Sequence, residues 1–248
     1  MEEGAIVHID YSLYNAESGD LIETNIEQIA KDNDSHQEGR TYSPLVSVVG
    51  GGALIEGFEE HLLEADSETD YDFTIPADKA YGELNSDMIE VISQDKVLQQ
   101  VKDPNSLGLG APITINGRTG TLRLWAAGRA RIDFNHPLAG VSLRYTYKVT
   151  KVIEDRDEKV MALLEANTGH KDFSVEFDGD DLGITIPQAM MFDTNAAMMK
   201  FRLVTTLRDS IEVDKVSFIE VHEDRKANPE HGDEGHVHDE NCNHDEEE

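Results

Sequence analysis

One short stretch of the chain, residues 48–60, combines glycines with apolar side chains at a spacing that could build a binding site. It reads Val-Val-Gly-Gly-Gly-Ala-Leu-Ile-Glu-Gly-Phe-Glu-Glu. The three glycines break a β-type run, and Leu54, Ile55 and Phe58 then follow at helical spacing. The pattern predicts a short amphipathic helix over residues 54–64, entered from a tight loop. A phosphate-binding loop is not indicated, because no Gly-Lys-Ser/Thr follows the glycines.

A second stretch, residues 73–82, adds a tyrosine in a turn. It reads Phe-Thr-Ile-Pro-Ala-Asp-Lys-Ala-Tyr-Gly, which predicts a strand ended by Pro76 and a turn that presents Tyr81 beside Gly82. The two stretches together resemble FKBP-type peptidyl-prolyl cis–trans isomerases, in which Val-Ile-x-Gly-Trp-Glu and Asp-x-Ala-Tyr-Gly line one apolar pocket.

A third motif indicates that this fold is interrupted and resumed. Asn-His-Pro-Leu-Ala-Gly at residues 135–140, with an alternating strand at 143–149, is similar to SlyD-like FKBP proteins, which carry an insert-in-flap domain at this point. Residues 155–222 resemble the extra C-terminal domain of archaeal long-type members of the family. The expected domains are residues 1–85 with 135–154 (discontinuous isomerase domain), 86–134 (insert), 155–222 (C-terminal domain) and 223–248 (disordered acidic His-containing tail).

The expected fold class is α+β: an FKBP-type antiparallel sheet wrapped on one short helix, a β-rich insert and a small α+β C-terminal domain. Residues 25–42 are polar and read as an extended loop. Local patterns predict strands at 6–14, 21–24, 45–49, 70–75, 112–117, 121–125, 130–134, 143–149, 173–177 and 215–221, and helices at 157–167 and after Asp193.

The resemblance implies peptidyl-prolyl cis–trans isomerisation (EC 5.2.1.8), which needs no cofactor. The planar amide opposes rotation with a barrier of about 18–20 kcal/mol. A catalyst needs an apolar socket for the proline ring and hydrogen bonds that hold the flanking carbonyls while the bond twists. The resemblance implies that the Tyr81 hydroxyl and the Ile55 N–H supply those bonds. By motif position, the pocket residues are Tyr11, Ile22, Glu23, Leu45, Leu54, Ile55, Phe58, Tyr81 and Tyr145.

Several positions depart from the family pattern. Ile22 and Leu45 replace aromatic residues and Phe58 replaces tryptophan, so the socket keeps its apolar character but loses ring surface. Glu23 is one methylene longer than the usual aspartate. Leu45, Leu54 and Phe58 could also be ordinary core residues, and a catalytically idle pocket would make the protein a holdase chaperone.

The net charge of −30 is unevenly distributed. Residues 1–85 carry 20 acidic and 3 basic side chains, whereas residues 86–134 carry 5 and 6. Such a negative field argues against nucleic acid or anionic lipid as partners. It also suggests adaptation to high intracellular salt, as in salt-loving archaea, with an ordinary acidic cytoplasmic protein as the alternative.

The near-neutral insert is expected to capture unfolded or proline-containing polypeptides, because repulsive charge would hinder such contacts. The family resemblance implies this chaperone role, and a purely structural appendage is the alternative. The sequence leaves the oligomeric state open. A cytoplasmic location is expected from the single cysteine, the non-basic start and the absence of a long apolar run.

The tail contains imidazole and thiolate groups suited to nickel, copper or zinc. SlyD-like proteins have a longer tail of this kind that binds nickel, so a metal-binding or metal-delivery role is a competing function. A merely acidic, solvating tail is the alternative. The candidate ligands are His231, His236, His238, Cys242 and His244.

Overall fold

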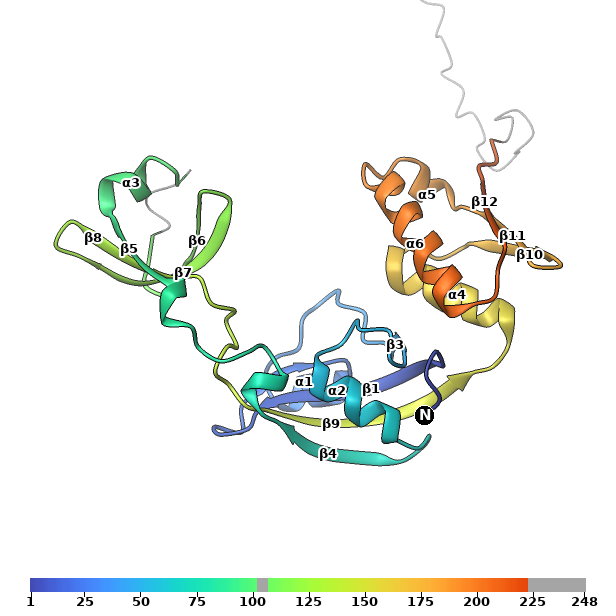
Figure 1. Cartoon of the computed structure of the whole chain (residues 1–248), viewed down its shortest axis with the longest axis horizontal. Coiled ribbons are helices and arrows are strands. Elements are labelled where there is room, and N and C mark those ends of the chain that lie inside the picture. Colours follow the sequence, from blue (N-terminus) through green and yellow to red (C-terminus); the bar gives the residue numbers. More distant parts are fainter. Residues whose placement is uncertain (102–106, 223–248) are drawn as a thin grey trace, which may run out of the picture.

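The chain folds around three separate β-sheets, each with a hydrophobic core on one face (Figure 1). The computed structural model describes residues 1–101 and 107–222. The α+β class is confirmed, with an FKBP-type sheet, a separate antiparallel sheet in the flap and a small α+β C-terminal unit. None of the helices in the described residues is long and apolar enough to cross a membrane.

The first sheet is antiparallel and has the order β2-β1-β9-β4, with β3 beside the first half of β1. Alternating β-branched and aromatic residues give β1 and β9 one face that is buried against helix α2 (Glu56–Glu64). Because β9 pairs with both β1 and β4, it is a central strand of the sheet, together with β1. The strands are β1 (Ile6–Asn15), β2 (Leu21–Thr24), β3 (Leu45–Val48), β4 (Asp70–Ile75) and β9 (Leu143–Ile153).

Helix α2 begins two residues later than the apolar spacing predicts. Ile55 is its N-cap, with extended backbone (φ −66°, ψ 147°), and its carbonyl accepts the first helical bonds. Gly57 allows the helix to approach β4 closely, because a Cβ at this position would lie 2.5 Å from the Ile75 Cγ2 atom. Leu54 and Ile55 therefore belong to the loop that enters the helix.

The segment predicted as an extended loop, residues 25–42, contains a short helix, α1 (Glu27–Asp32), so that prediction was wrong there. Six residues are too few to show helical periodicity, and this helix is held by tertiary contacts. Ala30 is buried against the rest of the domain, and the Thr24 hydroxyl accepts a hydrogen bond from the Ile26 N–H.

The insert forms a four-stranded antiparallel sheet of order β5-β8-β7-β6 with its own core. Its entry and exit are joined by two hydrogen bonds, from the Asn85 N–H to Asn135 Oδ1 (3.0 Å) and from Asn135 Nδ2 to the Asn85 carbonyl (3.0 Å). The elements of the insert are the 3₁₀ turn η2 (Ser86–Met88), strands β5 (Ile89–Ser93), β6 (Pro112–Ile115), β7 (Arg118–Ala126) and β8 (Arg129–Asp133), and helix α3 (Gln94–Leu98). The 3₁₀ turn η1 (Ala77–Lys79) precedes the insert and follows β4.

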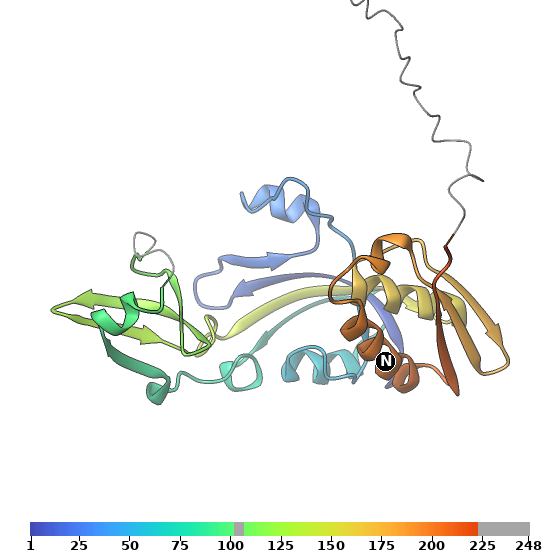
Figure 2. The ribbon, with the colours of Figure 1, turned by 90° about the horizontal axis from the view of Figure 1, so that it is seen from above.

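The C-terminal unit packs helices α4 and α6 on a three-stranded sheet of order β10-β11-β12. Its core includes Ile6 and Ile153, so it packs directly on the end of the first sheet. Figure 2 shows β9 running from the insert junction toward this unit. The elements are α4 (Arg156–Thr168), β10 (Ser174–Asp178), β11 (Asp181–Thr185), α5 (Gln188–Met191), α6 (Ala196–Ser210) and β12 (Lys215–Ile219).

Helix α4 has strong local signals at both ends, which is why its prediction was close. The Asp155 side chain accepts a hydrogen bond from the Glu158 N–H, and Gly169 ends the helix with a left-handed φ of 69°. By contrast, β11 was not predicted, because Asp181 and Gly183 interrupt its apolar pattern.

Candidate active site

A cavity of about 380 Å³ opens where the glycine loop enters α2. Eight of the nine pocket residues predicted from the motifs line it, and Ala53, which was not predicted, is the ninth lining residue. They are Tyr11, Glu23, Leu45, Leu54, Ile55, Phe58, Tyr81 and Tyr145, joined by Ala53. The fold thus gathers side chains that are up to 134 positions apart in the sequence.

The remaining predicted residue, Ile22, does not line this cavity. It lies in β2 with 38% of its surface exposed, while the next residue, Glu23, is at the cavity. Because successive side chains in a strand point to opposite faces, only one of these two neighbours can face the pocket.

Aromatic rings form the floor and one wall of the cavity. Phe58 is only 3% exposed, and its ring meets Tyr145 edge-on, with centroids 4.8 Å apart. The rings of Tyr11 and Tyr145 are 6.2 Å apart. The cavity therefore offers a mainly apolar surface to a ring-sized guest.

The phenols at this wall remain protonated near neutral pH. Burial raises the pKa of Tyr11 to about 12, and the nearby Glu23 carboxylate adds to the rise. Burial also raises the pKa of Tyr145. Their hydroxyl groups are thus available as neutral hydrogen-bond donors.

A buried carboxylate fixes the glycine loop, and the sequence reasoning missed it. Glu59 is 9% exposed, and its two oxygens accept hydrogen bonds from the Gly50 N–H (3.0 Å) and the Leu54 N–H (3.1 Å). No local pattern marks this glutamate, because its role is to accept hydrogen bonds from backbone groups of the loop. Glu59 therefore holds the loop that carries Leu54 and Ile55 at the cavity.

The Ile55 N–H is left available at the cavity edge. In the described residues it donates to no acceptor, whereas the neighbouring Leu54 N–H is bound by Glu59. A free N–H at the start of a helix also carries part of the helix dipole's positive charge. It can donate to a carbonyl of a bound peptide.

Tyr81 is held from outside the cavity by a residue that was not predicted as part of the site. The His136 ring stacks on the Tyr81 ring, with centroids 4.0 Å apart and planes 7° apart. His136 Nδ1 accepts from the Leu138 N–H (3.2 Å). The Asn-His motif marked only the return of the chain from the insert, and no local pattern predicts this contact across 55 positions.

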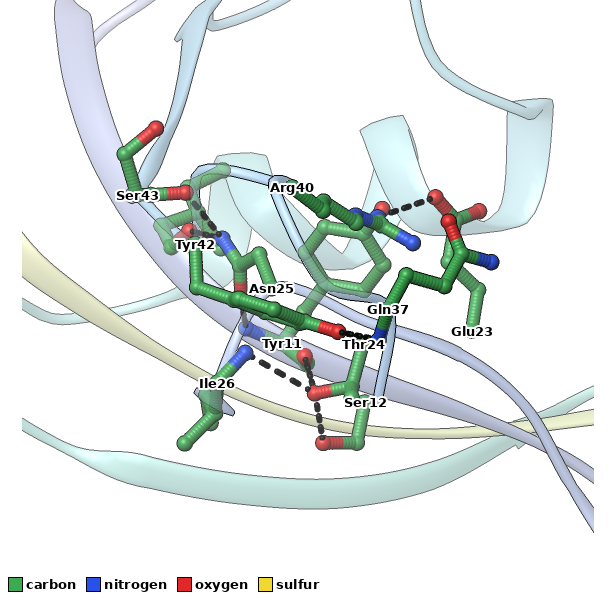
Figure 3. Close-up of polar contacts among 11 residues, drawn as sticks. Tyr11, Ser12, Glu23, Thr24, Asn25, Ile26, Gln37, Arg40, Tyr42 and Ser43 are labelled. Carbon is green, nitrogen blue, oxygen red and sulfur yellow. Dashed lines mark hydrogen bonds and ion pairs between the residues drawn. The ribbon is translucent and has the colours of Figure 1, made fainter. Parts of the chain in front are cut away.

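A polar network secures the rim of the cavity beside Tyr11 (Figure 3). The Tyr11 N–H donates to Asn25 Oδ1 (2.7 Å), and Asn25 Nδ2 donates to the carbonyls of Ile9 (2.8 Å) and Ser43 (3.2 Å). The Thr24 hydroxyl donates to the Tyr11 carbonyl (2.8 Å). These bonds take the place of a strand partner and tie the segment after α1 to β1.

The same rim carries an ion pair. Arg40 lies 3.3 Å from the Glu23 carboxylate and stacks over the Tyr42 ring at 5.3 Å from its centroid. Figure 3 shows the contact between Arg40 and Glu23 as a dashed line. Because both charged groups are partly exposed, the pair contributes little to stability, and its main effect is to orient Glu23.

The candidate metal ligands of the tail lie outside the described residues. Within residues 1–101 and 107–222, no group of three or more His, Cys, Asp or Glu side chains could hold a metal ion.

The comparisons with known proteins agree with this geometry. A family model described as FKBP-type peptidyl-prolyl cis-trans isomerase matches residues 1–101, and one described as FKBP26 C-terminal matches residues 156–223. The short-type peptidyl-prolyl cis-trans isomerase of Methanocaldococcus jannaschii is 33% identical over 152 residues, which cover 61% of this chain and 94% of that protein.

The chain belongs to the FKBP-type peptidyl-prolyl cis–trans isomerases. More distant members of the family include the FKBP-type isomerase SlyD of Treponema pallidum, which is 27% identical over 166 residues, 64% of this chain and 82% of that protein. SlyD of Helicobacter pylori is 23% identical over 161 residues, 62% of this chain and 76% of that protein. This FKBP-type isomerase thus combines the family's isomerase domain with an FKBP26-type C-terminal domain.

Proposed function

We propose that the cavity lined by Phe58, Tyr145 and Tyr81 is the site where this isomerase turns the peptidyl-prolyl bond. The observation that supports this most is the combination in one cavity of a buried aromatic floor with two separate donors. The proline ring would rest on Phe58, with the Tyr81 hydroxyl and the Ile55 N–H binding the flanking carbonyls.

Catalysis of the isomerisation follows from the shape of this site and its apolar lining. As the amide twists, it loses resonance and its carbonyl and nitrogen change polarity. An apolar wall disfavours the planar, polar ground state relative to the twisted one, and the two donors hold the chain on either side. No bond is made or broken, so no cofactor is required.

Replacing Tyr81 with phenylalanine should lower kcat/KM for a proline tetrapeptide about tenfold, the loss expected for one transition-state hydrogen bond. The ring and its stacking on His136 would remain. The measurement is peptide isomerisation by wild type and variant. Tyr71→Phe, which removes a hydroxyl that binds the Asp66 N–H outside the cavity, is the matched control and should retain full activity. Equal activity of both variants would mean that the hydroxyl is not used, and a fully idle wild type would favour a holdase.

We also propose that residues 86–134 act as a client-binding domain set between the two parts of the isomerase domain, 1–85 and 135–154. Val91, Arg131 and Leu124 lie in one row across β5, β8 and β7, and Val91 (61%) and Leu124 (46%) are exposed. In the described residues, the outer edges of β5 and β6 carry no strand partner. Exposed apolar side chains and open strand edges are features that bind unfolded chains.

For the tail, residues 223–248, we propose divalent metal binding by its four histidines and Cys242. A truncation after Val221 should isomerise peptides normally but lose most nickel binding in titration calorimetry. Five histidines remain in the truncated chain and serve as internal controls for weak binding by isolated histidines: His8, His36, His61, His136 and His170. Unchanged nickel affinity would contradict a metal role of the tail.

We further propose that the protein works in a cytoplasm of high salt concentration, because the negative charge of residues 1–85 repels itself. The melting temperature should rise by at least about 5 °C from about 0.1 M to about 1 M KCl, as the Debye length falls from about 10 Å to about 3 Å. Thermal unfolding followed by circular dichroism measures this, with an uncharged osmolyte as control. A melting temperature independent of KCl would argue for an ordinary acidic protein.

A further inference from the structure

A second cavity, of about 520 Å³, lies between the isomerase sheet and the C-terminal helices. Its walls come from β3 and the glycine loop on one side and from α4 and α6 on the other. Ala53 lines both this groove and the proline pocket, so the two cavities meet at the glycine loop. A chain whose proline is in the pocket could continue past Ala53 into the groove.

Backbone groups that could bind such a chain are exposed along β3. Only one edge of β3 is paired, with β1, and in the described residues no strand lies on its other edge. Val49 bonds to the β1 side, and the alternation of an antiparallel ladder directs the groups of Ser47 there as well. The N–H groups of Val46 and Val48 therefore point to the open edge, where an extended peptide could pair with them.

The charged side chains of the groove have one sign. Glu3 and Asp209 are its only charged lining residues, and neither forms an ion pair with a described residue. Both are exposed, one on each side of the groove. A peptide with a basic side chain would therefore be favoured over one with an acidic side chain at this point.

We propose that this groove binds the extended segment of the client that flanks its proline, pairs it with the edge of β3, and selects a basic residue there. The proposal rests on the assignment of the neighbouring pocket as the isomerase site. The groove thereby makes the isomerase site prefer clients that carry a basic residue several positions away from the prolyl bond that is isomerised.

The test compares peptides that differ at one position, using the full-length protein. Two pairs of longer peptides carry a single proline, with Lys or Glu at the third residue before it or at the third residue after it. A proline tetrapeptide, which occupies the pocket but does not reach the groove, is the reference substrate. In at least one pair the wild type should show about tenfold higher kcat/KM for the Lys peptide.

The variant Glu3→Gln with Asp209→Asn should reduce this preference to less than about twofold while leaving tetrapeptide turnover unchanged. Its matched control, Glu2→Gln with Glu212→Gln, removes the same charge from exposed neighbours that do not line the groove, and it should keep the preference.

Three results would overturn the proposal. No Lys preference in either pair would exclude the groove as a subsite. Equal loss in the variant and its control would assign the preference to the overall negative field. If the wild type turns over the longer peptides while Tyr81→Phe and Phe58→Ala leave tetrapeptide turnover unchanged, the pocket assignment fails, and the groove as its extension fails with it.

Discussion

Replacing Phe58 with alanine should lower the free energy of unfolding by about 3–5 kcal/mol and reduce kcat/KM at least about tenfold. The side chain is 3% exposed and its ring packs against Tyr145 and Tyr147 (4.8 Å each) and Phe73 (6.0 Å). Its removal leaves a cavity beneath the proline site, so both the fold and the socket lose contacts. Denaturant unfolding and tetrapeptide isomerisation measure the two effects.

Phe73→Ala separates stability from catalysis in this experiment. Phe73 packs on the same ring cluster but does not line the pocket, so its loss should destabilise the protein with a smaller effect on turnover. If the folded fraction of Phe58→Ala isomerises peptides at the wild-type rate, the floor of the socket lies elsewhere.

Excising residues 86–134 and bridging the ends with a short glycine loop should separate two activities. Tetrapeptide turnover should persist, whereas refolding of a proline-limited protein should slow at least about tenfold because client capture is lost. The cut is feasible because Asn85 and Asn135 are hydrogen-bonded to each other and the Gly140 N–H donates to the Gly82 carbonyl (2.8 Å). Closing such a short loop costs little conformational entropy.

A milder variant tests the same surface without removing the insert. Val91→Ser with Leu124→Ser changes two exposed side chains of one row and should slow refolding while leaving the insert's core intact. Thr114→Ala, on β6 away from this row, is the control. Full refolding activity in the excised protein would rule out the insert as the client-binding domain.

The motifs predicted most of the pocket residues because these residues lie next to strong local sequence signals. Leu54, Ile55 and Phe58 follow the glycines directly, and Tyr81 precedes a glycine in a turn. Their periodicity still misplaced the start of α2, because Leu54 and Ile55 are apolar as pocket residues of the loop and were counted as helix. The roles assigned to them in catalysis stay predictions, as does the cytoplasmic location.

The residues that support the pocket could not be found in this way. Glu59 and Asn25 act through hydrogen bonds to backbone groups, which leave no pattern in side-chain hydrophobicity. His136 reaches Tyr81 only because the chain returns from the insert beside it. The prediction for Ile22 came from its motif position in the second strand, and a four-residue strand is too short to show from its own alternation which face each residue takes.

The central position of β9 also bears on how the nascent chain folds on the ribosome. Residues 1–82 supply β1–β4 and most of the pocket, yet β1 and β4 both pair with β9, which is completed only at Ile153. The insert is translated in between and is closed by contacts among its own residues. It can therefore fold while the isomerase sheet still lacks this central strand. A client-binding surface would then be in place on each new molecule before its own catalytic pocket has formed.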